Sequence, residues 1–157
     1  MNKKSLNFLW MGLLFLSVNS MVSGCKRNAP TPSSEIYFKK TSCFGTCPIY
    51  SMTIQGSGLA TFEGIRFTEK IGKHTKELSS EEVKRIFNGL ASLDWNEIDE
   101  LYPTNISDLP STIIKLKHRK IDRKVIIAGE HPAFLDVIDD ELSKIAMSDG
   151  WTSVNSE

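Results

Sequence analysis

Residues 49–63 of the chain read IYSMTIQGSGLATFE. In this stretch Tyr50, Met52 and Ile54 alternate with small polar residues, the period of two that is typical of a strand with one buried face. The glycines at positions 56 and 58 favour a tight turn, because glycine adopts positive φ without a steric penalty. The segment therefore predicts two neighbouring strands of a meander joined by a turn.

Similar patterns on both sides of this stretch extend the predicted sheet. The breaks at Gly64 and Gly72 separate one further strand of the meander, and the polar pair Arg119-Lys120 marks the turn of a later hairpin. In the second arm of that hairpin, consecutive apolar residues at 125–127 indicate burial on both faces. The additional strands are predicted at residues 36–41, 59–63, 65–71, 112–118 and 121–128.

Two helices are predicted from apolar residues that recur every three or four positions. Ser79 and Glu82 form the sequence of a capping box, in which each side chain bonds the backbone amide of the other residue. An apolar stripe follows at Val83, Ile86, Phe87 and Leu90. The second helix begins with Pro132, whose missing amide is harmless in a first turn, and its predicted inward residues are Phe134, Leu135, Ile138, Leu142 and Ile145.

The order of these elements predicts the fold class and its limits. Strands, helix, strands and helix favour an α+β domain, with an antiparallel sheet (meander plus hairpin) and two helices packed on it. Residues 95–110 are predicted as an irregular connection whose prolines resist helix, with Trp95 and Tyr102 completing the core. The globular domain is expected at residues 36–149, followed by a polar tail at 150–157.

The N-terminus carries the pattern of an export signal. Two lysines precede a nearly unbroken apolar run at residues 8–18, which is too short to cross a bilayer as a helix. Shortly after this run, Val22-Ser23-Gly24-Cys25 resembles the lipobox of bacterial lipoproteins. This resemblance implies a cleaved signal peptide at residues 1–24 and a lipidated, palmitate-bearing Cys25 that attaches the chain to a membrane.

The residues after Cys25 suggest a flexible spacer and a location in the cell envelope. Residues 25–35 contain two prolines and no large apolar side chain, so we expect a flexible tether in front of the domain. Lys26 is not the aspartate associated with inner-membrane retention in some bacteria. We therefore expect a periplasm-facing protein of the cell envelope, in the outer membrane rather than the inner one.

The charge balance excludes some partners. The full chain has 19 Lys and Arg residues and 19 Asp and Glu residues, and removal of the predicted signal peptide takes away two lysines. A nucleic-acid partner would need a basic stripe to replace counterions, and a polybasic membrane patch would need an excess of lysine. The balance argues against both.

Cys43 and Cys47 are the two thiols left if Cys25 is lipidated. In an oxidising compartment, the stretch Cys43-Phe44-Gly45-Thr46-Cys47-Pro48 predicts a small disulfide that closes the loop between the first two strands. The spacing is also similar to the copper-binding motif of Sco-type cytochrome oxidase assembly proteins, with a histidine as the third ligand. In those proteins the cysteines begin a helix, whereas a strand is predicted after Cys47.

The histidines and acidic runs suggest no catalytic site. His74, His118 and His131 are the candidates for that third copper ligand, but none has the i, i+4 spacing of a helical metal site, and we expect solvated or capping side chains. No serine lies in a G-x-S-x-G turn, and no glycine-rich loop precedes a helix. The sequence predicts no catalytic residue, cofactor or metal.

The cysteine motif, together with Tyr50, the Gly-x-Gly turn and the later Tyr102, resembles an uncharacterised family of bacterial lipoprotein domains of unknown function. The resemblance covers roughly residues 36–147 and implies no activity. We expect a non-catalytic accessory or binding module, with an envelope protein as a possible partner. The alternatives are a thiol redox or copper-handling protein that uses Cys43 and Cys47, and an inhibitor of a cell-wall hydrolase.

Overall fold

The computed structural model describes residues 29–154. The predicted signal peptide, Cys25 and the first residues of the predicted tether lie outside the described residues. Within the described range, no helix is long and apolar enough to cross a membrane.

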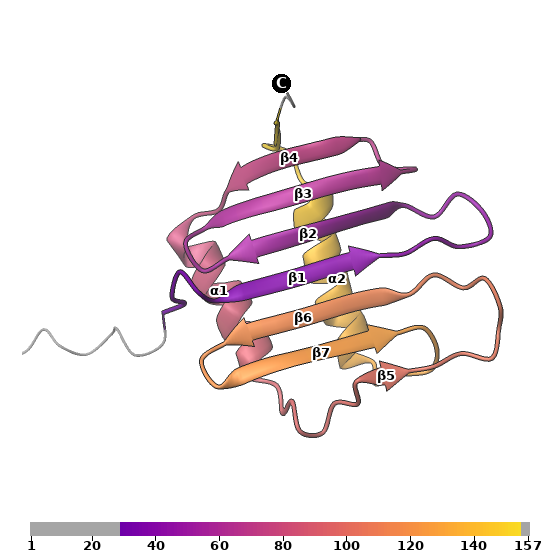
Figure 1. Cartoon of the computed structure of the whole chain (residues 1–157). Helices are drawn as coiled ribbons and strands as arrows, with labels where there is room; N and C mark the ends of the chain where they lie inside the picture. Colours follow the sequence, from indigo (N-terminus) through magenta and orange to yellow (C-terminus); the bar gives the residue numbers. More distant parts are fainter. Residues whose placement is uncertain (1–28, 155–157) are drawn as a thin grey trace, which may run out of the picture.

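The described chain forms one open, mixed eight-stranded sheet with the order β5-β7-β6-β1-β2-β3-β4-β8 (Figure 1). The central strand β1 is paired with β2 on one side and with β6 on the other, both antiparallel. The strands are β1 (Glu35–Lys40), β2 (Ile49–Gln55), β3 (Leu59–Arg66), β4 (Gly72–Glu77), β5 (Leu101–Tyr102), β6 (Thr112–His118), β7 (Ile121–Ile127) and β8 (Thr152–Ser153).

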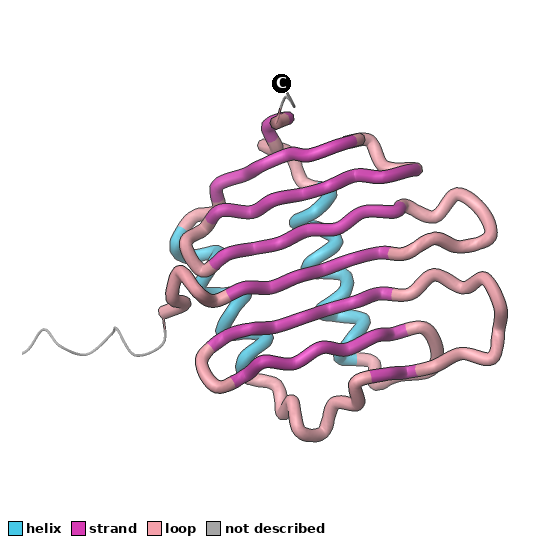
Figure 2. The backbone as a smooth tube through the Cα atoms, viewed as in Figure 1, coloured by secondary structure: helices cyan, strands magenta, loops and turns pink. Residues whose placement is uncertain are grey.

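Helices α1 (Ser80–Ala91) and α2 (Phe134–Met147) lie against one face of this sheet (Figure 2). The predicted capping box of α1 is present, with the Ser79 hydroxyl accepting from the Glu82 amide and the Glu82 carboxylate accepting from the Ser79 amide. The four predicted stripe residues of α1 are all buried. The α+β class is therefore confirmed.

The prediction of a purely antiparallel sheet is wrong. Leu101 and Tyr102 pair in parallel with Ile126 and Ile127 of β7. The chain leaves α1, crosses below the sheet and enters the edge beside β7 in the same direction as that strand. A strand of two residues has no alternation to detect, which is why this segment was predicted as an irregular connection.

The predicted strand at 65–71 is also wrong, because β3 continues through Gly64 to Arg66 and the next strand begins at Gly72. A Cβ atom at position 64 would lie 1.6 Å from the carbonyl oxygen of Lys70. Gly64 is therefore needed for the close approach of the returning chain and does not end the strand.

The core lies between the helices and the sheet face that they cover. Phe38 packs edge-on against Tyr50, and Tyr50 stacks on Phe62 with ring centroids 5.3 Å apart. The predicted core positions Trp95 and Tyr102 are buried, but Phe134 is 40% exposed, which corrects its predicted inward position. The predicted inward residues Leu135, Ile138 and Leu142 are buried, and α2 buries Ala146 as well.

The ends of the domain extend into the predicted tether and tail. Ser34 is 2% exposed, and its hydroxyl forms a hydrogen bond of 2.9 Å with Nδ1 of His118. At the other end, β8 pairs with β4, and Trp151 lies against Phe62 with ring centroids 5.5 Å apart. Both ends of the described chain are thus tied to the sheet by side chains near its core.

Candidate binding surface

Cys43 and Cys47 lie in the loop between β1 and β2. Their Cα atoms are 5.8 Å apart and their sulfur atoms are bonded, so the structure brings the two thiols together as predicted. Within the ring that the disulfide closes, the Gly45 amide donates to the Cys43 carbonyl at 3.0 Å. A covalent ring of this size restricts the backbone of the loop before any partner arrives.

The disulfide loop is fastened to the loop at residues 103–111 that precedes β6. The Thr41 amide donates to the Ser111 carbonyl at 3.0 Å, and the Ser111 amide donates to the Thr41 hydroxyl at 2.7 Å. Further out, the Phe44 amide donates to the Asp108 carbonyl at 3.1 Å. The two loops therefore form one connected surface at the end of the sheet.

Large apolar side chains project into solvent from these two loops. Phe44 is 91% exposed at the tip of the disulfide ring, and Ile106 and Leu109 of the second loop are 65% and 43% exposed. We call these three residues the distal surface, since β1 separates their end of the molecule from the end at which the described chain begins (Figure 1). The sequence placed Phe44 in the cysteine motif but gave no signal that its ring is exposed.

A polar cluster lies beside the distal surface, where α2 begins. Lys40 forms an ion pair with Asp139 and donates to the Thr112 hydroxyl at 3.0 Å. The other oxygen of Asp139, Oδ1, is buried without a hydrogen-bond partner among the described residues. Asp139 lines a cavity of about 140 Å³ together with Pro110, His131 and Asp136, a volume that suits a few water molecules.

The three histidines lie in different parts of the fold. His131 bonds the Gly129 carbonyl at 2.6 Å and Asp136 at 2.9 Å, which fits the predicted position at a helix start. His118 is 1% exposed and packs on Phe87, so the expectation of a solvated or capping side chain is wrong for it. Within residues 29–154, no three His, Cys, Asp or Glu side chains gather in a way that could hold a metal ion.

The two perturbed histidines are expected to give stability opposite pH dependences. Burial, aided by the charge of Arg119, lowers the pKa of His118. The contribution of His118 to the free energy of unfolding is therefore full above about pH 6.5 and is lost as the pH falls through the lowered pKa. The Gly129 carbonyl and Asp136 raise the pKa of His131, so its contribution is full below about pH 6.5 and is lost as the pH rises through the raised value.

Urea unfolding at a series of pH values from about 5 to 8 measures both effects. The free energy of unfolding should decline on both sides of a maximum near pH 6.5. His118→Asn should flatten the acid limb and His131→Asn the alkaline limb. An acid limb that keeps its slope in the His118 variant would contradict this assignment.

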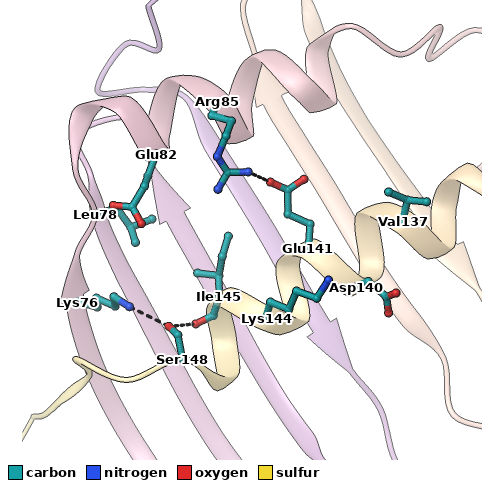
Figure 3. Close-up of a pocket in the computed structure, with 10 residues that line it drawn as sticks. All are labelled: Lys76, Leu78, Glu82, Arg85, Val137, Asp140, Glu141, Lys144, Ile145 and Ser148. Atoms are coloured by element: carbon teal, nitrogen blue, oxygen red, sulfur yellow. Dashed lines mark hydrogen bonds and ion pairs between the residues drawn. The ribbon is translucent and has the colours of Figure 1, made fainter.

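A groove of about 540 Å³ lies between α1 and α2. Figure 3 shows Arg85 of α1 and Glu141 of α2 pointing toward one another across it, and these two side chains form an ion pair. Lys76 donates to the Ser148 hydroxyl at 2.8 Å at one end of the groove. Three basic and three acidic side chains line the groove, so it presents no excess charge to a ligand: Lys76, Arg85, Lys144, Glu82, Asp140 and Glu141.

Comparison with known proteins identifies one family. The model of the family described as "Domain of unknown function (DUF6438)" matches residues 34–146. This range begins at the buried Ser34 and ends at the last buried residue of α2. Neither the curated proteins nor the solved structures contain a match to the chain.

Proposed function

The chain belongs to the DUF6438 family, whose function is unknown, and we propose that it is a lipid-anchored accessory protein of the cell envelope. In this proposal the chain is not an enzyme, and it binds another envelope protein through the distal surface. The observation that carries the proposal is the exposed Phe44 ring, held on a disulfide-closed loop that is bonded to a second loop with exposed apolar side chains.

An exposed phenylalanine of this kind favours a binding role. Isolated apolar side chains on a surface are common, but three large ones on two fastened loops are typical of a contact site. Aromatic side chains that enter a partner's pocket often contribute most of the binding free energy. Because the disulfide already restricts the loop, little conformational entropy remains to be lost on binding.

The N-terminal pattern supports the lipid anchor. Val22-Ser23-Gly24-Cys25 lies three residues after an apolar run of export-signal length. The DUF6438 match begins at residue 34, so only a short segment separates Cys25 from the folded domain. Two or more acyl chains on Cys25 would hold that domain at a membrane without a spanning helix.

The anchor is tested by the mass of the N-terminal peptide of the chain expressed with its signal in a bacterial envelope. We expect a processed chain that begins at Cys25, carries acyl chains and fractionates with membranes. Cys25→Ser should remain unprocessed and carry no acyl chains. An unmodified wild-type Cys25 would refute the anchor.

The binding surface is tested by a photoreactive amino acid placed at position 44 in intact cells. A discrete protein adduct is expected, and Leu109→Ser should weaken it without changing the amount of folded chain. The control position is Glu81, which is exposed on α1. Adducts that are equally abundant from positions 44 and 81, or absent from both, would contradict a protein partner at the distal surface.

The reduction potential of the Cys43–Cys47 disulfide separates this proposal from the redox alternative. A potential below about −300 mV is typical of a structural disulfide and fits a rigid binding loop. A potential near −200 mV or above is typical of an exchangeable pair of cysteines. Such a potential, combined with copper binding that is lost in Cys43→Ser, would favour the thiol redox or copper-handling function.

A further inference from the structure

The sheet face turned away from the helices is uncovered in the described part of the chain (Figure 2). Its side chains form rows across neighbouring strands, because residues that are paired in register point to the same face. In one row the charges alternate, with Lys117 of β6 between Glu35 of β1 and Asp122 of β7. This is the arrangement that stabilises an exposed sheet in water.

The next row breaks that arrangement. Lys115 of β6 lies directly opposite Lys124 of β7, and both side chains are exposed. Like charges in directly opposite positions destabilise a sheet. On the other side of Lys115 lies Tyr37 of β1, and the Lys115 ammonium is 5.1 Å from the centre of its ring.

Further basic side chains surround this pair. Lys117 follows Lys115 on the same face of β6, and Lys39 follows Tyr37 on the same face of β1. None of the ion pairs among the described residues involves any of these lysines. We call Lys39, Lys115, Lys117 and Lys124 the lysine patch.

The repulsion between Lys115 and Lys124, next to a row in which the charges alternate, suggests that an anionic ligand compensates the charge of the two lysines. Local rules of sheet stability are broken mainly where function requires it. The near-neutral composition of the chain conceals this patch, since the fold gathers lysines on β1, β6 and β7 and leaves α2 with four acidic side chains and one lysine. An anionic ligand would remove the repulsion between Lys115 and Lys124.

The shape of the face and the position of the predicted tether identify the ligand. The lysine patch consists of strand residues that share one face of the sheet, so it offers an extended surface to a ligand. Glu35 belongs to the same face and is both the last residue of the predicted tether and the first residue of β1. The ten residue steps from Cys25 to Glu35 span at most about 36 Å, which keeps the start of β1 close to an anchoring bilayer.

We propose that the lysine patch lies on the anionic phospholipid headgroups of the membrane that holds the anchor, an inference that rests on the proposed lipidation of Cys25. The ammonium groups neutralise headgroup phosphates, and Tyr37 lies at the level of the headgroups, as interfacial aromatic residues do. The attraction is electrostatic and is weakened by salt.

The test uses the lipidated chain reconstituted in two kinds of vesicle, one of phosphatidylcholine alone and one with about a third phosphatidylglycerol. Acetylation of each lysine is measured by mass spectrometry. Lys115 and Lys124 should react several-fold more slowly on the anionic vesicles, and high salt should remove the difference. Lys84, exposed on α1, should react equally on both.

A substitution separates binding from stability. Lys124→Glu places an acid opposite Lys115, so it should raise the melting temperature while it abolishes the protection of Lys115. Lys84→Glu makes the same charge change on α1 and should leave that protection intact. Equal reactivity of Lys115 on the two vesicles, or protection that survives in Lys124→Glu, would overturn the proposal.

Two further outcomes distinguish this inference from its premise. Protection of Lys115 by soluble heparin but not by anionic vesicles would overturn the membrane proposal in favour of a soluble polyanion. In the other outcome, the chain purified from the envelope carries no acyl group on Cys25 while its Lys115 is still protected on anionic vesicles. That result would refute the anchor and leave the lysine patch as a membrane site.

Discussion

Phe62→Ala is expected to lower the free energy of unfolding by about 3–5 kcal/mol, as large-to-small changes of buried aromatic residues do. Phe62 is 1% exposed, stacks on Tyr50 and contacts the ring of Trp151. Its removal leaves a cavity in the core beside β3 and takes away the ring contact of Trp151, next to β8. Natural domains are stable by about 5–15 kcal/mol, so this single change removes a large share.

Phe44→Ala is the matched control, because it deletes the same atoms from a side chain that is 91% exposed. We expect a change within about 0.5 kcal/mol. Urea unfolding followed by tryptophan fluorescence measures both variants. A loss in Phe44→Ala comparable to that in Phe62→Ala would mean that the Phe44 ring packs against the domain, and it would remove the basis for the distal surface.

The local elements were predictable because their signals are periodic. Residues 49–55 show the alternation of β2, and the capping box with its apolar stripe shows α1. Strands β5 and β8 have two residues each, too few for any alternation. Gly64 was predicted to end a strand, but it lies inside β3. Glycine is favoured both at the end of a strand and where two backbone segments approach closely, so the residue type alone does not distinguish the two cases.

The candidate surfaces depend on contacts that a sequence does not contain. A hairpin about Arg119-Lys120 already implies that Lys115 lies opposite Lys124, since both are equally distant from the turn. The position of Tyr37 and Lys39 beside them follows only from the pairing of β1 with β6, a strand order that local patterns do not encode. The burial of His118 likewise depends on Ser34, which is 84 positions away.

The two proposed surfaces imply an orientation on the membrane. The lysine patch lies on the sheet face turned away from the helices, and the distal surface lies at the end of β1. If the sheet face that bears the lysine patch rests on headgroups, β1 runs along the bilayer, and the loop that carries Phe44 lies at the end of this strand. A partner that contacts Phe44 would then be a protein at the membrane surface rather than one in the open periplasm.

Gly129→Ala is expected to destabilise the domain by about 1–3 kcal/mol or more, the range of changes that force the backbone to move. A Cβ atom at this position would lie 2.0 Å from the carbonyl oxygen of Pro103. The amides of Ala128 and Gly129 both donate to the Tyr102 carbonyl at 2.9 Å, and these bonds fix β5. The added methyl group pushes away the start of the loop that bears Ile106 and Leu109.

Gly89→Ala is the same substitution at another site, and we expect it to raise the stability of the domain instead of lowering it. Gly89 lies inside α1, and a Cβ atom there would meet nothing within 4 Å. Alanine should therefore stabilise the domain by about 0.5–1 kcal/mol, because it restricts the unfolded chain and favours helix. Hydrogen exchange should show faster opening at residues 101–111 in Gly129→Ala alone. If Gly129→Ala were as stable as the wild type, Pro103 could move freely, and the second loop of the distal surface would not be held in place by β5.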